Sequence, residues 1–282
     1  MTAHHKGAAL HLGLNHVDPD HYQGWDGELA GCQNDARDLQ AIAAAAGFET
    51  TLLLDEQASA EPVKAAITKA GGALAAGDVF LLTYSGHGSQ VPDKNGDETE
   101  DGYDETWVLF DRQLVDDELY ALWSKFAAGV RIVVLSDSCH SGTAIRETLD
   151  SITPDALGAR LTIPKPNGMR TMPKAQQREV YKAHQSLYDG IQAAEPAGDT
   201  VEITAHVLLL SGCQDNQTSA DGKRNGLFTQ TLLEVWDSGK YKGGYKRFYD
   251  AILDKMPPWQ SPNWLTVGPS STSFSRRRPF TI

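Results

Sequence analysis

The segments TYSGHGS at residues 83–89 and SDSCHSG at residues 136–142 are the most informative parts of this 282-residue chain. Each overlaps or follows a predominantly apolar run, DVFLLTY at 78–84 and VRIVVL at 130–135. Such runs are typical of strands buried on both faces of a parallel sheet. Because ligands bind outside the carboxyl ends of the strands in open parallel sheets, we expect His87 and Cys139 to share a cleft there.

The rest of the chain alternates apolar runs with helical stretches, which favours an α/β fold with a mostly parallel central sheet flanked by helices. We expect further strands at 8–14, 50–54, 106–110 and 206–210, and helices at 34–46, 61–75, 116–127, 226–237 and 245–255. Asn34 and Gly47 suit the cap and the stop of the first helix. Residues 1–282 are therefore interpreted as one domain, with a proline-rich inserted linker at 150–199 that holds one helix near 174–188.

Composition narrows the classes of function. The formal net charge of −12 argues against a nucleic-acid partner, which would need clustered Lys and Arg. Three cysteines, Cys32, Cys139 and Cys213, give no disulfide framework and favour a reducing compartment. No secretory pattern and no long apolar window is found, so we expect a cytoplasmic protein without a membrane partner.

The histidine and the cysteine together suit nucleophilic catalysis. A thiol with a pKa of about 8.5 is only partly ionised at neutral pH, and a neighbouring imidazole raises its thiolate fraction and can protonate a leaving amine. We assign the oxyanion hole to the backbone N–H groups of Gly88 and Cys139, and the chemistry requires no cofactor. Taken singly, such a cysteine is more often a core residue and such a histidine a surface one. His140 is a rival base, but neighbouring side chains on an extended segment point to opposite faces.

At these residues the chain resembles the caspase-like peptidases, especially the metacaspases and their bacterial relatives. The matching pieces are GCQNDARDL at 31–39, YSGHGS at 84–89, DGYDETWV at 101–108, DDEL at 116–119, DSCHSGT at 137–143 and SGCQDNQTSAD at 211–221. The resemblance implies a caspase-hemoglobinase fold, a cysteine endopeptidase that cuts after Arg or Lys, and a monomer.

The resemblance also implies an acidic S1 pocket, formed here by Cys32, Asp35, Ser85 and Asp137, with Asp215 as a further candidate. Two carboxylates in one pocket would accept a guanidinium through charge-assisted hydrogen bonds. A pocket for a P1 Asp would instead need arginines, and none of these pocket positions is an arginine. The alternative for Asp35 is an acid that only stabilises the first turn of a helix.

Calcium is the one cofactor that the sequence suggests. Seven acids lie between residues 93 and 105, but their spacing does not match an EF-hand, and such a charge run is commonly a solvated loop. The resemblance implies Asp116 and Asp117 as calcium ligands in those relatives that need calcium. Other relatives do without it, so both alternatives stay open.

The linker suggests a route to activation. Five of its basic residues, Arg160, Lys165, Arg170, Lys174 and Arg178, lie in a segment that we expect to be exposed, where proteolysis concentrates. The enzyme itself or an upstream activating protease could cut there, or the linker could be an incidental insertion. For the whole chain, two alternatives remain open: a clostripain- or gingipain-like Arg/Lys protease, and a non-catalytic caspase-like scaffold.

Overall fold

A computed structural model describes residues 5–96, 102–139, 168–195, 200–213, 219–269 and 271–282. Its main feature is a six-stranded sheet with the strand order β2-β1-β3-β7-β8-β9. Neighbouring strands run parallel except for β8 and β9. The strands are β1 (Gly7–Gly13), β2 (Glu49–Leu54), β3 (Val79–Ser85), β7 (Arg131–Asp137), β8 (His206–Ser211) and β9 (Asn263–Val267).

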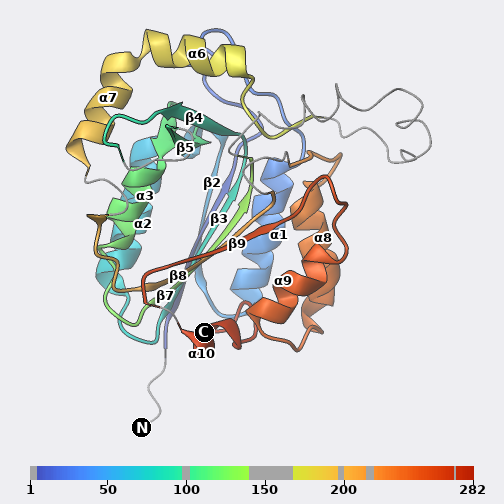
Figure 1. Ribbon diagram of the computed structural model, residues 1–282. Coiled ribbons are helices and arrows are strands. Elements are labelled where there is room, and N and C mark those ends of the chain that lie inside the picture. Colours follow the sequence, from blue (N-terminus) through green and yellow to red (C-terminus); the bar gives the residue numbers. More distant parts are fainter. Residues whose placement is uncertain (1–4, 97–101, 140–167, 196–199, 214–218, 270) are drawn as a thin grey trace.

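Helices cover both faces of this sheet (Figure 1). One face carries α1 (Cys32–Ala45), α8 (Leu227–Trp236) and α9 (Tyr245–Leu253); the other carries α2 (Ala60–Ala73) and α3 (Asp116–Trp123). Side chains alternate along each strand, so Leu82 of β3 packs into one core and Leu81 into the other. All seven residues of β3 and of β7 are buried, which confirms the prediction from their apolar runs.

A second, antiparallel sheet lies beside the first; only one of its strands was predicted, at 106–110, where it overlaps β5. It consists of β4 (Gly88–Pro92), β5 (Tyr103–Val108) and β6 (Gln113–Val115). Its strands are short, and β4 (GSQVP) has neither the length nor the apolar character that marks a strand in sequence. The described residues also form three short helical segments: η1 (Asp55–Gln57), η3 (Asp237–Gly239) and α10 (Thr272–Ser275).

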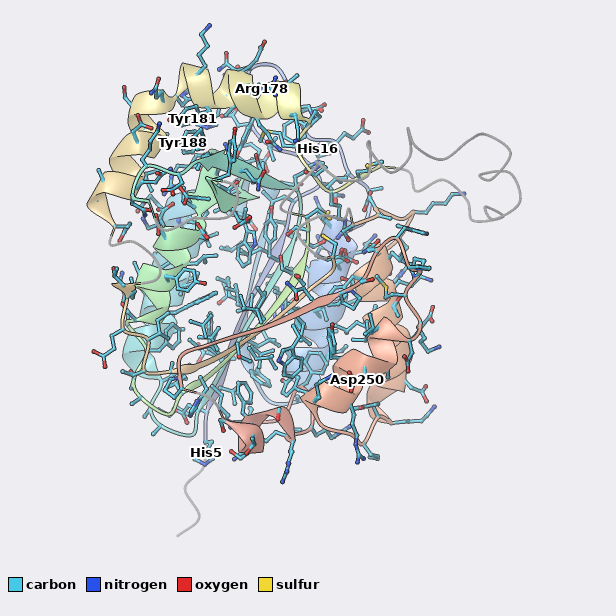
Figure 2. The ribbon with its side chains drawn as sticks, viewed as in Figure 1. His5, His16, Arg178, Tyr181, Tyr188 and Asp250 are labelled. Atoms are coloured by element: carbon cyan, nitrogen blue, oxygen red, sulfur yellow. The ribbon has the colours of Figure 1, made fainter. Side chains whose placement is uncertain are left out.

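The second half of the predicted linker is a packed element rather than a loose one. It forms two helices, α6 (Lys174–Ala183) and α7 (Gln185–Ala194), where one was expected. The break comes at His184, which leaves helical geometry and stacks its ring on His21 with 4.0 Å between centroids. Figure 2 shows Arg178 on α6 and Tyr188 on α7; Arg178 is exposed, whereas Tyr188 is buried.

One prediction about a helix start is wrong. The first helix begins at Cys32, after Gly31, and Asn34 lies inside it instead of capping it. The Asn34 side chain donates to the carbonyl oxygen of Arg224, far along the chain. The Asn34 side chain therefore makes a long-range tertiary contact instead of capping the helix as the local sequence pattern predicts.

Candidate active site

The candidate site lies at the carboxyl ends of β3 and β7. Strand pairing aligns Ser85 with Asp137 at these ends. His87 and Cys139 each follow two residues later, and both are buried. The parallel register therefore brings the histidine loop and the cysteine loop to the same edge of the sheet, as the sequence predicts.

The His87 ring is held between an aromatic side chain and a backbone carbonyl. Its Nε2 lies 3.0 Å from the carbonyl oxygen of Gly27, so Nε2 carries the proton and donates it there. The Trp25 ring lies against His87 with 4.7 Å between centroids. Burial lowers the pKa of His87 to about 4, although the Gly27 carbonyl opposes that shift. His87 is therefore a neutral base at pH 7, and its buried Nδ1 has no hydrogen-bond partner among the described residues.

Cys139 is surrounded by hydrogen-bonding groups in the cleft. Its Sγ lies 2.6 Å from the Sγ of Cys213 and accepts a hydrogen bond from the backbone N–H of Ser219. Burial raises the pKa of the Cys139 thiol, and the Cys213 thiol raises it further. In this form of the protein Cys139 is therefore a neutral thiol, not half of an ion pair with His87.

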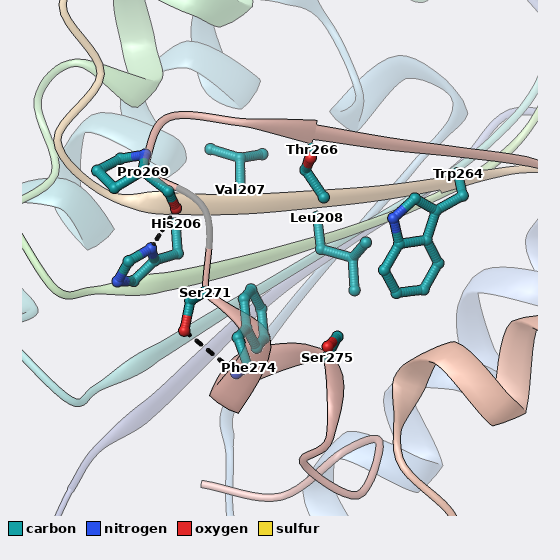
Figure 3. A pocket seen from close by; sticks show the side chains of 9 residues that line it. All are labelled: His206, Val207, Leu208, Trp264, Thr266, Pro269, Ser271, Phe274 and Ser275. Atoms are coloured by element: carbon teal, nitrogen blue, oxygen red, sulfur yellow. Dashed lines mark hydrogen bonds between the residues drawn. The ribbon is translucent and has the colours of Figure 1, made fainter.

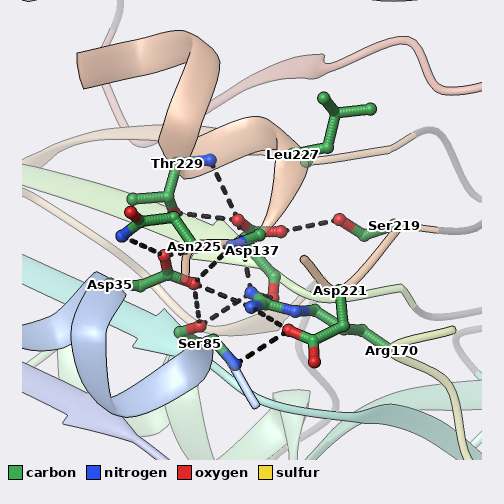
Figure 4. A network of polar contacts seen from close by, with 12 residues as sticks. Asp35, Ser85, Asp137, Arg170, Ser219, Asp221, Asn225, Leu227 and Thr229 are labelled. Atoms are coloured by element: carbon green, nitrogen blue, oxygen red, sulfur yellow. Dashed lines mark hydrogen bonds and ion pairs between the residues drawn. The ribbon is translucent and has the colours of Figure 1, made fainter. Parts of the chain in front are cut away.

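Arg170 fills the pocket beside Cys139, and Figure 4 shows the network around it. Its Nη2 lies 2.8 Å from Asp35 Oδ2 and 2.8 Å from Asp221 Oδ1. Its Nη1 lies 3.2 Å from Asp137 Oδ2 and donates to the Ser85 hydroxyl at 2.7 Å. Three carboxylates thus surround one fully buried guanidinium.

Neighbouring elements hold these carboxylates in place. The start of α8 supplies backbone N–H donors, from Gly226 to Asp35 and from Thr229 to Asp137. Asp221 accepts from the backbone N–H groups of Ala30 and Gly31 at the start of α1. Helix N-termini stabilise negative charge, so the pocket is built to keep its acids ionised. Burial nevertheless raises the pKa of Asp35 to about 6, against the opposing effect of Arg170.

The backbone around Arg170 is bound as firmly as its side chain. Its N–H donates to the Ser219 carbonyl at 3.0 Å, and the Asp221 N–H donates to the Gly168 carbonyl at 3.1 Å. An antiparallel bridge pairs Met169 with Ala220. The Arg170 carbonyl oxygen accepts from the Gly88 N–H at 3.0 Å and from the Cys139 N–H at 3.2 Å. These two donors are the ones that the sequence assigned to the oxyanion hole.

The predicted S1 residues are brought together in part. Asp35, Ser85 and Asp137 contact Arg170 directly, while Cys32 is fully buried nearby, with Arg170 among its charged neighbours. Asp215 and His140 lie outside the described residues, as do the candidate cleavage sites Arg160 and Lys165. The expectation that Arg170 is exposed is wrong, because the three acids draw it into the pocket; Lys174 and Arg178 are exposed.

Two residues of the site were missed from sequence. Asp221 is the last residue of the SGCQDNQTSAD motif, and its place in the pocket depends on a contact across 190 residues with Gly31. Gln260 is fully buried; its amide donates to Ser219 Oγ and to the Gly212 carbonyl, and its Oε1 accepts from Ala220 N. It therefore supports the segment that pairs with residues 168–170.

The described residues do not form a calcium site. Asp116 and Asp117 start α3, where Asp117 Oδ2 accepts from the Asn95 side chain at 2.7 Å. Across the described ranges, no group of three or more His, Cys, Asp or Glu residues could hold a metal ion. Calcium takes six to eight oxygen ligands, and acids 97–101 lie outside the described residues, so calcium binding stays a prediction.

A separate pocket lies under α10, beside the first residues of β8 and thus at the other end of the sheet from Cys139 (Figure 3). Its lining includes His206, Trp264 and Phe274, and it has a volume of about 30 Å³, room for about one water molecule. The His206 ring is already bound to the Pro269 carbonyl oxygen at 2.7 Å. This pocket is too small for a peptide side chain and lies away from Cys139.

The sequence is similar to a known family of peptidases. The family model described as "Caspase domain" matches residues 9–266. The chain belongs to this caspase-domain peptidase family. Metacaspase-1 of Mycosarcoma maydis is 31% identical over 89% of this chain and 67% of its own length, and Metacaspase-1 of Schizosaccharomyces pombe is 31% identical over 82% and 59%. The chain thus spans roughly 59–67% of these relatives.

Solved structures agree on the caspase-like fold. The structure of protein GSU0716 from Geobacter sulfurreducens has a TM-score of 0.87 and 50% identity, covering 98% of this chain and 99% of that one. Caspase-1 from Spodoptera frugiperda has a TM-score of 0.57 at 14% identity, covering 94% and 86%, and supports the fold alone. Within the described part of the chain, no helix is both long and apolar enough to cross a membrane.

Proposed function

We propose that this protein is a cysteine endopeptidase that cleaves after Arg or Lys, with Cys139 as nucleophile and His87 as proton carrier. The observation that supports it best is the binding of Arg170. Its guanidinium contacts Asp35, Asp137 and Asp221, and its carbonyl oxygen accepts hydrogen bonds from two backbone N–H groups. This is the arrangement that a substrate's P1 residue needs. A P1 Asp would instead bring a fourth carboxylate into the same buried pocket.

The proposed reaction begins when the Cys139 thiol loses its proton to His87 and attacks the carbonyl carbon that follows the P1 side chain. The N–H groups of Gly88 and Cys139 hold the resulting oxyanion, and removing one such donor typically costs about 10²–10³ in rate. His87 then protonates the leaving amine, and water hydrolyses the thioester. The Gly27 carbonyl keeps the His87 proton on Nε2, which leaves Nδ1 to carry the transferred proton.

Turnover of short fluorogenic peptides tests this proposal. Peptides that end in Arg or Lys should be hydrolysed and peptides that end in Asp should not. Cys139→Ala should reduce turnover by about 10³ or more, because it removes the nucleophile. Preference for Asp would overturn the pocket assignment, and a folded protein whose cleft is open to substrate but that turns over none of these peptides would favour a non-catalytic scaffold.

The same contacts lead us to propose that the described form is self-inhibited and that the enzyme activates by cutting the Arg170–Thr171 bond. Residues 168–172 occupy the cleft, so no other peptide can enter. The backbone of Thr171, which would be the first residue of the leaving segment, is close enough to raise the pKa of His87. Cleavage would release Arg170 from the covalent restraint of α6.

Protein sequencing of the purified enzyme tests the cleavage point. The active protein should contain a new N-terminus at Thr171, while Cys139→Ala should remain one chain. Arg170→Lys should still be cut and Arg170→Gln should not, since only lysine keeps the charge that the pocket binds. Arg178→Gln, on the exposed face of α6, is the matched control and should be cut normally. An active, intact chain would refute the activation step but not the peptidase.

A further inference from the structure

Cys213 has no role in the proposed reaction, yet it contacts the nucleophile. It follows β8 by two residues, and strand pairing aligns Ser211 of β8 with Ser136 of β7. The Cys139 and Cys213 sulfur atoms are in direct contact, 2.6 Å apart, against a bond length of about 2.05 Å in a disulfide. The parallel pairing of β7 and β8 therefore places two free thiols next to each other at the carboxyl ends of these strands.

The third cysteine provides an internal contrast. Cys32 is equally buried, but its charged neighbours are Arg170, Asp35 and Asp221, and burial raises the pKa of its thiol. No contact between Cys32 and another sulfur is found among the described residues. A general tendency of cysteines to be buried explains Cys32, whereas the pairing of Cys213 with the nucleophile needs a separate reason.

We propose that Cys213 is a resolving thiol, which forms a reversible disulfide with Cys139 when the open cleft meets a peroxide. The proposal rests on the proposed function, in that Cys139 is the reactive thiol. The Cys139 thiolate attacks one peroxide oxygen, the O–O bond breaks, and a sulfenic acid and water form. The Cys213 thiol then attacks the Cys139 sulfur, the S–O bond breaks, a second water leaves, and the two thiols have given two electrons to the peroxide.

The disulfide would switch the enzyme off and protect it. With its sulfur bonded to Cys213, Cys139 cannot attack a peptide carbonyl. Without a resolving thiol, the sulfenic acid would be oxidised further to the sulfinic acid, which dithiols do not reverse. Cys139 is fully buried beneath residues 168–172 in the described form, so the oxidation belongs to the cleaved or opened enzyme.

Mass mapping of peroxide-treated enzyme tests the inference. After treatment with hydrogen peroxide, blocking of free thiols and digestion without reductant, the wild-type protein should yield a peptide linking residues 139 and 213, and dithiothreitol should restore activity. Cys213→Ala should give no such peptide, and the activity it loses to the same dose should not return. Cys32→Ala should still give the link, because Cys32 takes no part in it.

The outcomes separate this inference from the proposed function. The linked peptide is read by mass and does not require peptidase activity; a link in a protein that cleaves no peptide would refute only the peptidase. Sulfinic acid at Cys139 in the wild-type protein, with no link to Cys213, would overturn the inference even if the peptidase is active. A wild-type chain unfolded in urea is the control for chance pairing, and should link Cys32 as readily as Cys213.

Discussion

Two buried ion-pair clusters in this protein have opposite ratios of carboxylates to cations. In the pocket of the candidate site, Asp35, Asp137 and Asp221 surround the single cation of Arg170. At the start of α3, the single carboxylate of Glu118 lies between two cations, 2.8 Å from Arg112 and 2.6 Å from Lys64. Both groups are buried, but only the first has an excess of negative charge.

The difference indicates what each group is for. Glu118 also accepts from the Val115 N–H, and its two cations come from α2 (Lys64) and from the residue before β6 (Arg112). Such an ion pair fixes α3 and is not exchanged. The three acids of the pocket keep their negative charge when the Arg170 guanidinium leaves. The guanidinium of a substrate can therefore bind in its place. An acidic pocket that the chain fills with its own arginine is a receptor for substrate, whereas Glu118 is part of the scaffold.

The largest effect should follow from removing one acid of the pocket. Asp137→Asn keeps the shape but takes away a buried charge, and losing one partner of a buried charge pair costs about 2–5 kcal/mol, or about 10²–10³ in kcat/KM near the middle of that range. We expect this loss for Arg peptides, with stability changed less than activity. The matched control is Asp237→Asn, which makes the same charge change in an exposed pair with Lys240. Equal kcat/KM in both variants would remove Asp137 from the pocket.

The opposite pattern is expected at Glu118. Glu118→Ala leaves Arg112 and Lys64 facing each other, and breaking a buried pair in this way costs about 3 kcal/mol of unfolding free energy. Denaturant unfolding should show this loss, while the ratio of Arg to Asp peptide turnover should stay as in the wild type. Although burial alone would raise the pKa of Glu118, Arg112 and Lys64 lower it. The stabilisation is therefore present above the pKa of an unfolded Glu and is lost as the pH falls through the lower, folded value. A shift in substrate preference would show that Glu118 belongs to the site.

Sequence and structure differ over these two regions for physical reasons. The strand ends that carry His87 and Cys139 were predictable because long apolar runs mark buried strands and parallel strands place their carboxyl ends together. Asp35 and Asp137 were assigned to the pocket because the sequence around them resembles motifs of a known family. Asp221 and the burial of Arg170 were not predictable, because each depends on contacts between segments far apart in the chain.

Two strands of the small antiparallel sheet were missed because β4 is short and largely polar and β6 has only three residues, so periodicity does not reveal them. The fold is thus fixed by local apolar patterns, while the contents of the pocket depend on tertiary contacts. A basic, proline-rich segment is exposed in most proteins, and here three acids reverse that tendency for one of its arginines.

The smallest effect should be the response of the pocket to pH. Burial raises the pKa of Asp35 to about 6 with a guanidinium in place, so kcat for Arg peptides should fall about tenfold per pH unit below that value. The sign follows from charge: Asp35 attracts the guanidinium when ionised and loses that attraction when protonated. An empty pocket lacks the cation that lowers this pKa, so kcat/KM should begin to fall at a higher pH than kcat. In the closed form burial lowers the pKa of His87 to about 4, so the Asp35 variant is needed to separate the titration of Asp35 from that of His87 in the open enzyme. Asp35→Asn should be less active at pH 7 but lack the step; a step that persists in this variant would assign the titration to another group.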